Sequence, residues 1–242
     1  MDSREHERVL DLINNPPPGS KLAAARDYGI DLTLFLHSLE LSPEERLREL
    51  EDAQPFLEEL RRATKKGGRP VTSLERTLAV LSDAGIKFVV IGGVAMYARG
   101  SAHLTRDLDI CYERTQRNID KLASALAPFH PHLRGAPPDV PFVLDARTIS
   151  NGMNFTLSTD LGELDLLGEV AGLGQYPQVM ACATPVMVWG RACDALSIEG
   201  LIRSKRAAGR SRDLEAVREL EGLAELEQHP AKGQGGELGD ES

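Results

Sequence analysis

The chain has 242 residues, of which 41% are hydrophobic and 27% are charged, and its formal net charge at pH 7 is −9. This composition is typical of a soluble globular protein, and the acidic balance argues against a broad nucleic-acid surface. Cys111, Cys182 and Cys193 lack the spacing of a zinc site, so we expect reduced thiols. No apolar run approaches the roughly 20 residues that span a bilayer, and the first residues lack a signal-peptide core. We therefore expect a cytoplasmic protein without a membrane segment.

The first 66 residues are predicted to form a small helical module. A helix over residues 4–14 must end at the prolines of 16–18, because proline lacks an amide donor and clashes with the preceding turn. Ser20 and Asp31 are residue types that cap helices, and we expect each of them to begin a further short helix.

A longer helix is predicted from the run SPEE at residues 42–45. The run combines a serine cap, a proline at the first helical position and a glutamate three residues after the cap. Pro55 should kink or split this helix. One apolar stripe of the helix needs burial, and it consists of Leu47, Leu50, Leu57 and Leu60.

A break in composition at KKGGRP, residues 65–70, suggests a domain boundary. We expect a helical module at 1–66, a linker at 67–71, a larger domain at 72–226 and an acidic tail at 227–242. The tail is rich in glycine and acidic residues and has no periodicity, so we expect it to be disordered.

The larger domain is organised around residues 86–112. Within this segment, Lys87–Ile91 is β-branched and aromatic, which predicts a short buried strand. Gly92 and Gly93 follow, and the small and apolar residues of 94–99 favour a helix. Because glycine has no Cβ atom, a phosphate can approach the backbone amides at such a strand-to-helix turn closely. The turn is therefore half of a candidate nucleotide site.

The other half is the predicted strand Arg106–Tyr112. Its side chains alternate, so Asp107 and Asp109 share one face, opposite the apolar residues. Two carboxylates this close raise each other's pKa unless a cation lies between them, and Mg²⁺ prefers such oxygen ligands. Taken alone, the same pattern also fits a strand with one solvated face.

The remaining pattern predicts a mixed sheet with helices packed on it, which places the domain in the α/β (α+β) class. Residues 130–149 hold several prolines and glycines and are predicted to form a long irregular excursion, a type of loop that is usually functional or disordered. The other expected elements are helices over 72–84 and 116–129, strands over 153–159 and 163–167, a strand or hairpin over 186–189 and 191–196, and a helix capped by Ser197.

The glycine turn and the aspartate strand together carry a family resemblance. Gly92-Gly93 followed by TRDLDI at 105–110 resembles the signature of the DNA polymerase β nucleotidyltransferase superfamily. The stretch is most similar to the minimal nucleotidyltransferases of the abortive-infection toxin (AbiEii-like) branch. His103 stands where that branch more often has arginine, whereas Thr105 is retained. The resemblance covers about residues 74–225 and implies a nucleotidyltransferase fold.

The resemblance implies that Asp107, Asp109 and Asp165 are both the catalytic carboxylates and the ligands of two Mg²⁺ ions. Glu163 lies on the same face as Asp165 and is the competing candidate for the third carboxylate. The implied reaction is transfer of an NMP from an NTP to a hydroxyl group of an RNA or protein acceptor, within a toxin–antitoxin or phage-defence system.

Nucleotide-binding roles are implied for Gly92, Gly93, Thr105, Lys205 and Arg210. Lys205 interrupts the apolar face of the helix expected over 198–208, and burying an ammonium group without a partner is costly. Its charged end reaches either the triphosphate or water. The spacing of Lys205, Arg210 and Asp213 resembles the family's C-terminal motif. Alternatively, Ser211 caps the last helix and Asp213 only stabilises its N-terminus.

Two further functions stay open. The chain could be a noncatalytic nucleotide-sensing or partner-binding member of the fold, as the replacement at His103 suggests, or an interaction protein that acts through its N-terminal helices. Residues 1–66 are similar to short helical proteins found beside nucleotidyltransferases of this branch, which makes them either an antitoxin-like partner fused in cis or a helical decoration. An RNA acceptor could contact the basic cluster of Arg203, Lys205, Arg206, Arg210 and Arg212.

Overall fold

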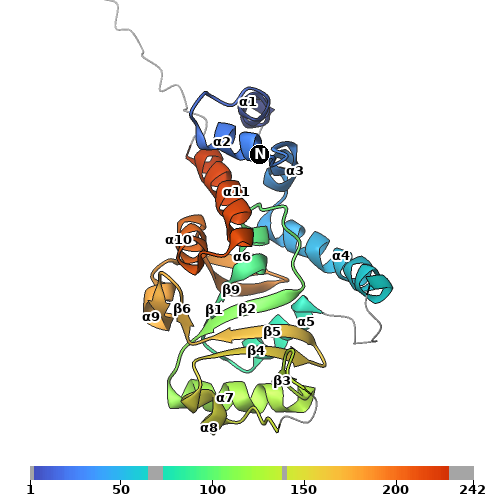
Figure 1. The fold of residues 1–242 in the computed structure, drawn as a ribbon, viewed down its shortest axis with the longest axis vertical. Helices are drawn as coiled ribbons and strands as arrows, with labels where there is room; N and C mark the ends of the chain where they lie inside the picture. Colours follow the sequence, from blue (N-terminus) through green and yellow to red (C-terminus); the bar gives the residue numbers. More distant parts are fainter. Residues whose placement is uncertain (1–2, 65–72, 138–140, 229–242) are drawn as a thin grey trace, which may run out of the picture.

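A mixed sheet forms the centre of the molecule, with the strand order β3-β4-β5-β2-β1-β9-β8 (Figure 1). The computed structural model describes residues 3–64, 73–137 and 141–228. β2 is parallel to β5 and β1 is parallel to β9, whereas the other neighbours are antiparallel. The strands of this sheet are β1 (Phe88–Ile91), β2 (Asp107–Tyr112), β3 (His132–Leu133), β4 (Asn154–Thr159), β5 (Gly162–Leu167), β8 (Ala183–Val188) and β9 (Arg191–Leu196). A separate ribbon pairs β6 (Glu169–Val170) with β7 (Gly174–Gln175).

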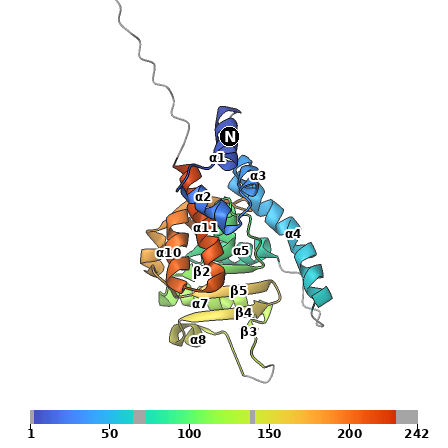
Figure 2. The same cartoon turned by 45° about the horizontal axis from the view of Figure 1, so that its top comes forward.

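Helices flank the sheet and extend beyond it (Figures 1 and 2). α10 and α11 pack against each other near α6, and α7 packs against α8 near β3 and β4. The helices are α1 (Ser3–Asn14), α2 (Lys21–Tyr28), α3 (Thr33–Glu40), α4 (Pro43–Thr64), α5 (Leu74–Asp83), α6 (Gly92–Ala98), α7 (Gln116–Leu126), α8 (Ala146–Asn151), α9 (Tyr176–Met180), α10 (Ile198–Ala208) and α11 (Ser211–Glu227), with a 3₁₀ turn at Ala127–Phe129. The predicted α/β class, a mixed sheet flanked by helices, is confirmed.

The apolar core is continuous from the N-terminal helices to the sheet. Leu22, Phe35 and Leu47 belong to the same buried cluster as Val89 and Leu108. Helix α11 packs against α2, and α4 packs against α6 and β8. The predicted division at residues 1–66 and 72–226 stays a prediction, because the linker at 67–71 and nearly all of the tail at 227–242 lie outside the described residues.

Most of the predicted helix starts are confirmed. The hydroxyl groups of Ser20, Ser73 and Ser197 accept backbone hydrogen bonds at the first turns of α2, α5 and α10. Ser42 and Glu45 form a reciprocal capping box, with the Glu45 carboxylate accepting from the Ser42 amide at 2.7 Å. Local sequence therefore fixes these helix starts.

Three local expectations need correction. Leu32 occupies the N-cap of α3, and Asp31 instead accepts from the Thr33 amide. Ser211 is the first residue of α11, which Arg210 precedes as N-cap. The expected split at Pro55 is wrong, since α4 runs through this residue as one helix, and the alternative, a kink, stays a prediction.

The excursion predicted over residues 130–149 is wrong in part, since it contains the short edge strand β3 and the first residues of α8. A two-residue strand has no detectable periodicity, and β3 forms because β4 offers it an edge to pair with. Asp145 caps α8 by accepting from the Thr148 amide at 2.7 Å. The β6–β7 ribbon and α9 were not predicted either, and both are similarly short.

The three cysteines are free thiols, with Cys111 and Cys193 buried and Cys182 half-buried. Among the described residues, no helix combines the length and the apolar character needed to cross a membrane.

Candidate functional site

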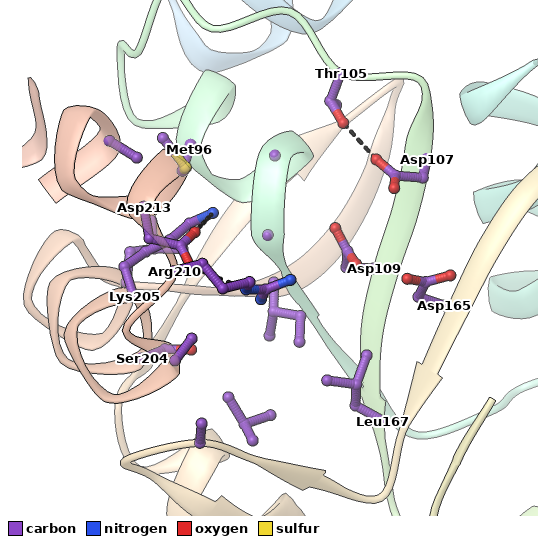
Figure 3. A pocket seen from close by; sticks show the side chains of 18 of the residues that line it. Met96, Thr105, Asp107, Asp109, Asp165, Leu167, Ser204, Lys205, Arg210 and Asp213 are labelled. Atoms are coloured by element: carbon purple, nitrogen blue, oxygen red, sulfur yellow. Dashed lines mark hydrogen bonds and ion pairs between the residues drawn. The ribbon is translucent and has the colours of Figure 1, made fainter. Parts of the chain in front are cut away.

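Three carboxylates converge on two neighbouring strands (Figure 3). β2 and β5 run parallel, and their register sets Asp109 beside Asp165 and Asp107 beside Glu163. Because side chains alternate along a strand, all four acids project from the same face of the sheet. Asp107, Asp109 and Asp165 can each offer one oxygen atom such that these oxygens lie within 4.8 Å of one another. Strand alternation predicted that Asp107 and Asp109 lie together, and the family resemblance implied Asp165 as the third member.

The carboxylates carry a charge that the protein compensates only in part. Burial, followed by the charges of Asp107 and Asp165, raises the pKa of Asp109 to about 8. Burial also raises the pKa of Asp165 to about 6, against the lowering effect of the nearby Arg134. Carboxylates with such raised pKa values gain free energy when a cation binds between them. The oxygen-only donor set fits a hard divalent ion such as Mg²⁺.

The glycine turn allows α6 to begin against these acids. Gly92 has φ +62°, and a Cβ atom at this position would lie 2.0 Å from Asp109 Oδ2. A Cβ at Gly93 would lie 2.5 Å from the Cβ of Thr105, and the Gly93 amide donates to Asp109. Both positions therefore require glycine for close approach.

Thr105 lies at the entrance of β2 and orients the first acid. Its hydroxyl group donates to Asp107 Oδ1 at 2.6 Å (Figure 3), and its side chain is buried. Its backbone carbonyl accepts from the Gln54 side chain of α4 at 2.9 Å. Sequence reasoning did not select Gln54, which is 51 residues away along the chain.

Arg134 is the main site residue that sequence reasoning missed. Its Nη1 lies 2.7 Å from Glu163 Oε2 and 3.6 Å from Asp107 Oδ2, and its Nη2 bonds Asp165 Oδ1. The Arg134 amide also donates to the Thr156 carbonyl, which continues the pairing of β3 with β4. Its only sequence signal was its place in an excursion of the length that tends to be functional. The guanidinium group thus pairs with two of the three acids that could hold a metal ion.

The facing wall of the site comes from α10 and the start of α11. Lys205 Nζ lies 3.2 Å from Asp213 Oδ1, and Arg210 Nε lies 3.0 Å from Asp213 Oδ2. Asp213 is buried, which by itself would raise its pKa, but the hydrogen bond and charge of Lys205, together with Arg210, lower the pKa below its usual value. The partner that a half-buried Lys205 needs is thus Asp213, across the α10–α11 junction.

A cleft of about 450 Å³ separates the two walls. His103, at the position where the resembling branch has arginine, lines it together with Thr105. All of the predicted site residues line this cleft. Apolar residues also line it, and we refer to four of them as the apolar floor, namely Leu167, Val170, Leu201 and Ala208. A negative wall, a positive wall and an apolar floor are what a metal, a polyphosphate and a nucleoside would require.

No known family model and no curated protein matches the sequence. Among solved structures, the chain is similar to the crystal structure of the lincosamide antibiotic adenylyltransferase LnuA bound to lincomycin, with 12% identity and a TM-score of 0.43. The alignment covers 62% of this chain and 95% of that chain. The site must therefore be interpreted from its own geometry.

Proposed function

We propose that the chain is a Mg²⁺-dependent nucleotidyltransferase, which transfers an NMP from an NTP to a hydroxyl group of an RNA or protein acceptor. The observation that carries this proposal is the convergence of three carboxylates, with ligand oxygens within 4.8 Å of one another, across a cleft from a lysine and an arginine. A bare scaffold has no need for this arrangement, because the grouped acids repel each other.

In this proposal Asp107 and Asp109 hold the metal ions, and Asp165 completes the site on the acceptor side. Bound Mg²⁺ would supply Lewis-acid activation of the α-phosphate and of the attacking hydroxyl group. Thr105 keeps one oxygen of Asp107 in a fixed orientation. Glu163 stays the alternative third ligand, and Arg134 pairs with both Glu163 and Asp165.

Lys205 and Arg210 are assigned to the triphosphate. Both side chains form ion pairs with the buried carboxylate of Asp213, and these ion pairs limit their conformational freedom before substrate binds. Less conformational entropy is then lost on binding. The apolar floor of the cleft would contact the nucleoside, while the glycine turn allows α6 to approach the metal ligands.

A noncatalytic, nucleotide-sensing or partner-binding member of the fold is the second candidate. Arg134 favours it, since a guanidinium group that pairs with Asp107, Glu163 and Asp165 balances their charge without a metal ion. The two functions differ in one respect that can be measured, which is whether divalent metal and NTP together produce a covalent product.

The test is label transfer. Purified protein is incubated with Mg²⁺, each of the four NTPs labelled at the α-phosphate, and a whole-cell extract as the source of acceptors. We expect label in a macromolecular band with the wild type and none with Asp109→Asn. Asp194→Asn is the matched control, because Asp194 lies in the same sheet on β9 but does not line the cleft. Label that persists with Asp109→Asn would refute the assignment.

We further propose, from the AbiEii-like resemblance, that the enzyme acts as a toxin with an antitoxin-like partner, for which the N-terminal helices are a candidate in cis. If the partner is a separate protein, induced expression of the wild type should arrest growth, while Asp109→Asn should not. Equal growth of both strains would contradict a toxin with a separate partner and leave the transferase reaction untouched.

A further inference from the structure

Helix α4 holds both ends of the loop that leads from α6 to the metal-site strand β2. Arg46 Nη1 donates to the Ala98 carbonyl at 2.9 Å, and Gln54 Nε2 donates to the Thr105 carbonyl at 2.9 Å. Residues 46 and 54 are eight apart, so they lie on one face of the helix. The loop between these two contacts carries His103, which lines the cleft.

Gln54 is held in one orientation. Its side chain is buried, with 2% of its surface exposed, and Nε2 donates to two carbonyl groups, those of Leu50 and Thr105. A flipped amide would point oxygen at both carbonyls and is excluded by repulsion. Oε1 is buried without a hydrogen-bond partner. An apolar side chain would avoid this desolvation cost, so the contact with Thr105 forms at a cost to stability.

Thr105 passes this constraint to the metal site. Its hydroxyl group donates to Asp107 Oδ1 at 2.6 Å. Its side chain packs so tightly on α6 that a Cβ at Gly93 would lie 2.5 Å from it. A shift of the Thr105 backbone therefore moves the hydroxyl group that orients the Asp107 carboxylate. Mutation of a group that orients a metal ligand in this way typically lowers metal affinity or activity by about 10–100-fold.

We propose that Gln54 is a positioning residue for the metal site, which acts through Thr105 on the orientation of Asp107. This proposal rests on the proposed function, since it takes Asp107 to be a metal ligand. Helix α4, which belongs to the N-terminal segment, would then help to position a metal ligand of the site on the sheet.

The test measures Mn²⁺ affinity of the full chain by electron paramagnetic resonance, with Gln54→Leu and the equally long Gln54→Met. We expect about tenfold weaker binding in both variants. Trp189→Phe is the control, because Trp189 Nε1 also ties α4 to the domain, at the Leu47 carbonyl, but does not line the cleft. It should lower the melting temperature without a change in Mn²⁺ affinity. Equal affinity in the Gln54 variants and the control overturns the proposal.

A double-mutant cycle with Thr105→Val separates positioning from general destabilisation. If Gln54 acts through the Thr105 hydroxyl group, Gln54→Met should cost no further Mn²⁺ affinity once that hydroxyl is absent. Additive losses overturn the proposed route. Asp109→Asn distinguishes the two levels of inference. If it binds Mn²⁺ as tightly as the wild type, the metal site and the proposed function fail; if it loses binding while the Gln54 variants do not, only the positioning role fails.

Discussion

Replacing Arg134 with glutamine should lower the stability of the metal-free protein and raise its affinity for metal ions. The guanidinium group pairs with Glu163 and Asp165 and lies 3.6 Å from Asp107 Oδ2. In Arg134→Gln these acids lose their shared counter-charge, but a metal ion no longer has to displace an arginine from its ligands. Loss of the guanidinium charge therefore lowers the stability of the metal-free protein and raises its metal affinity.

The size of the effect follows from the burial of the pair. Removing one partner of a fully buried ion pair costs about 3–5 kcal/mol. Because 21% of the Arg134 side chain and 20% of that of Asp165 are exposed, we reduce the expected cost to about 2–3 kcal/mol for solvent screening. A domain of this size loses roughly 2–4 °C of melting temperature per kcal/mol, so we expect a loss of about 5–10 °C. If about 2 kcal/mol is recovered on metal binding, Mn²⁺ affinity rises by roughly 30-fold.

Calorimetry at pH 8 with and without Mn²⁺ measures both quantities. Arg114→Gln is the matched control, since Arg114 is half-buried and, among the described residues, bonds the Tyr112 hydroxyl group and backbone carbonyls but no carboxylate. It should lose stability at every Mn²⁺ concentration. The difference in melting temperature between Arg134→Gln and the wild type should instead disappear as Mn²⁺ saturates the site. Unchanged or weaker Mn²⁺ binding by Arg134→Gln would refute the view that the arginine competes with a metal ion for these acids.

Three further changes test the site. The pKa of Asp109 is raised to about 8 in the folded chain, so the free energy of unfolding of the metal-free protein should fall as pH rises from 4 to 8. In urea titrations, the free energy of unfolding of Asp109→Asn should exceed that of the wild type by more than about 2 kcal/mol at pH 8 and by little at pH 4. Gly92→Ala adds a Cβ 2.0 Å from Asp109 Oδ2 at φ +62°, and we expect a loss of at least about 2 kcal/mol in the same assay. Lys205→Ala should weaken NTP binding about tenfold in calorimetric titrations, whereas a loss of stability at unchanged affinity would show that its charged end serves only the ion pair with Asp213.

The sequence alone determined the elements whose signals are local. Serine caps, a proline at a first helical position and the alternation in β2 and β5 each depend on a few consecutive residues. They predicted most helix starts and the strands that carry Asp107, Asp109 and Asp165. The shared face of the carboxylates also followed, because side-chain alternation is a property of any strand.

Only the tertiary structure decided which distant groups complete the site. Arg134 reaches Glu163 and Asp165 because β3 pairs with β4, and this pairing has no periodic signature in a two-residue strand. Gln54 reaches Thr105 across 51 residues, and Asp213 reaches Lys205 across a helix junction. Such contacts depend on how whole elements pack, and many sequences can satisfy the same local pattern while packing differently. The sequence thus specified the acids, whereas the packing of the chain brought Arg134 to them and Gln54 to the threonine that orients one of them.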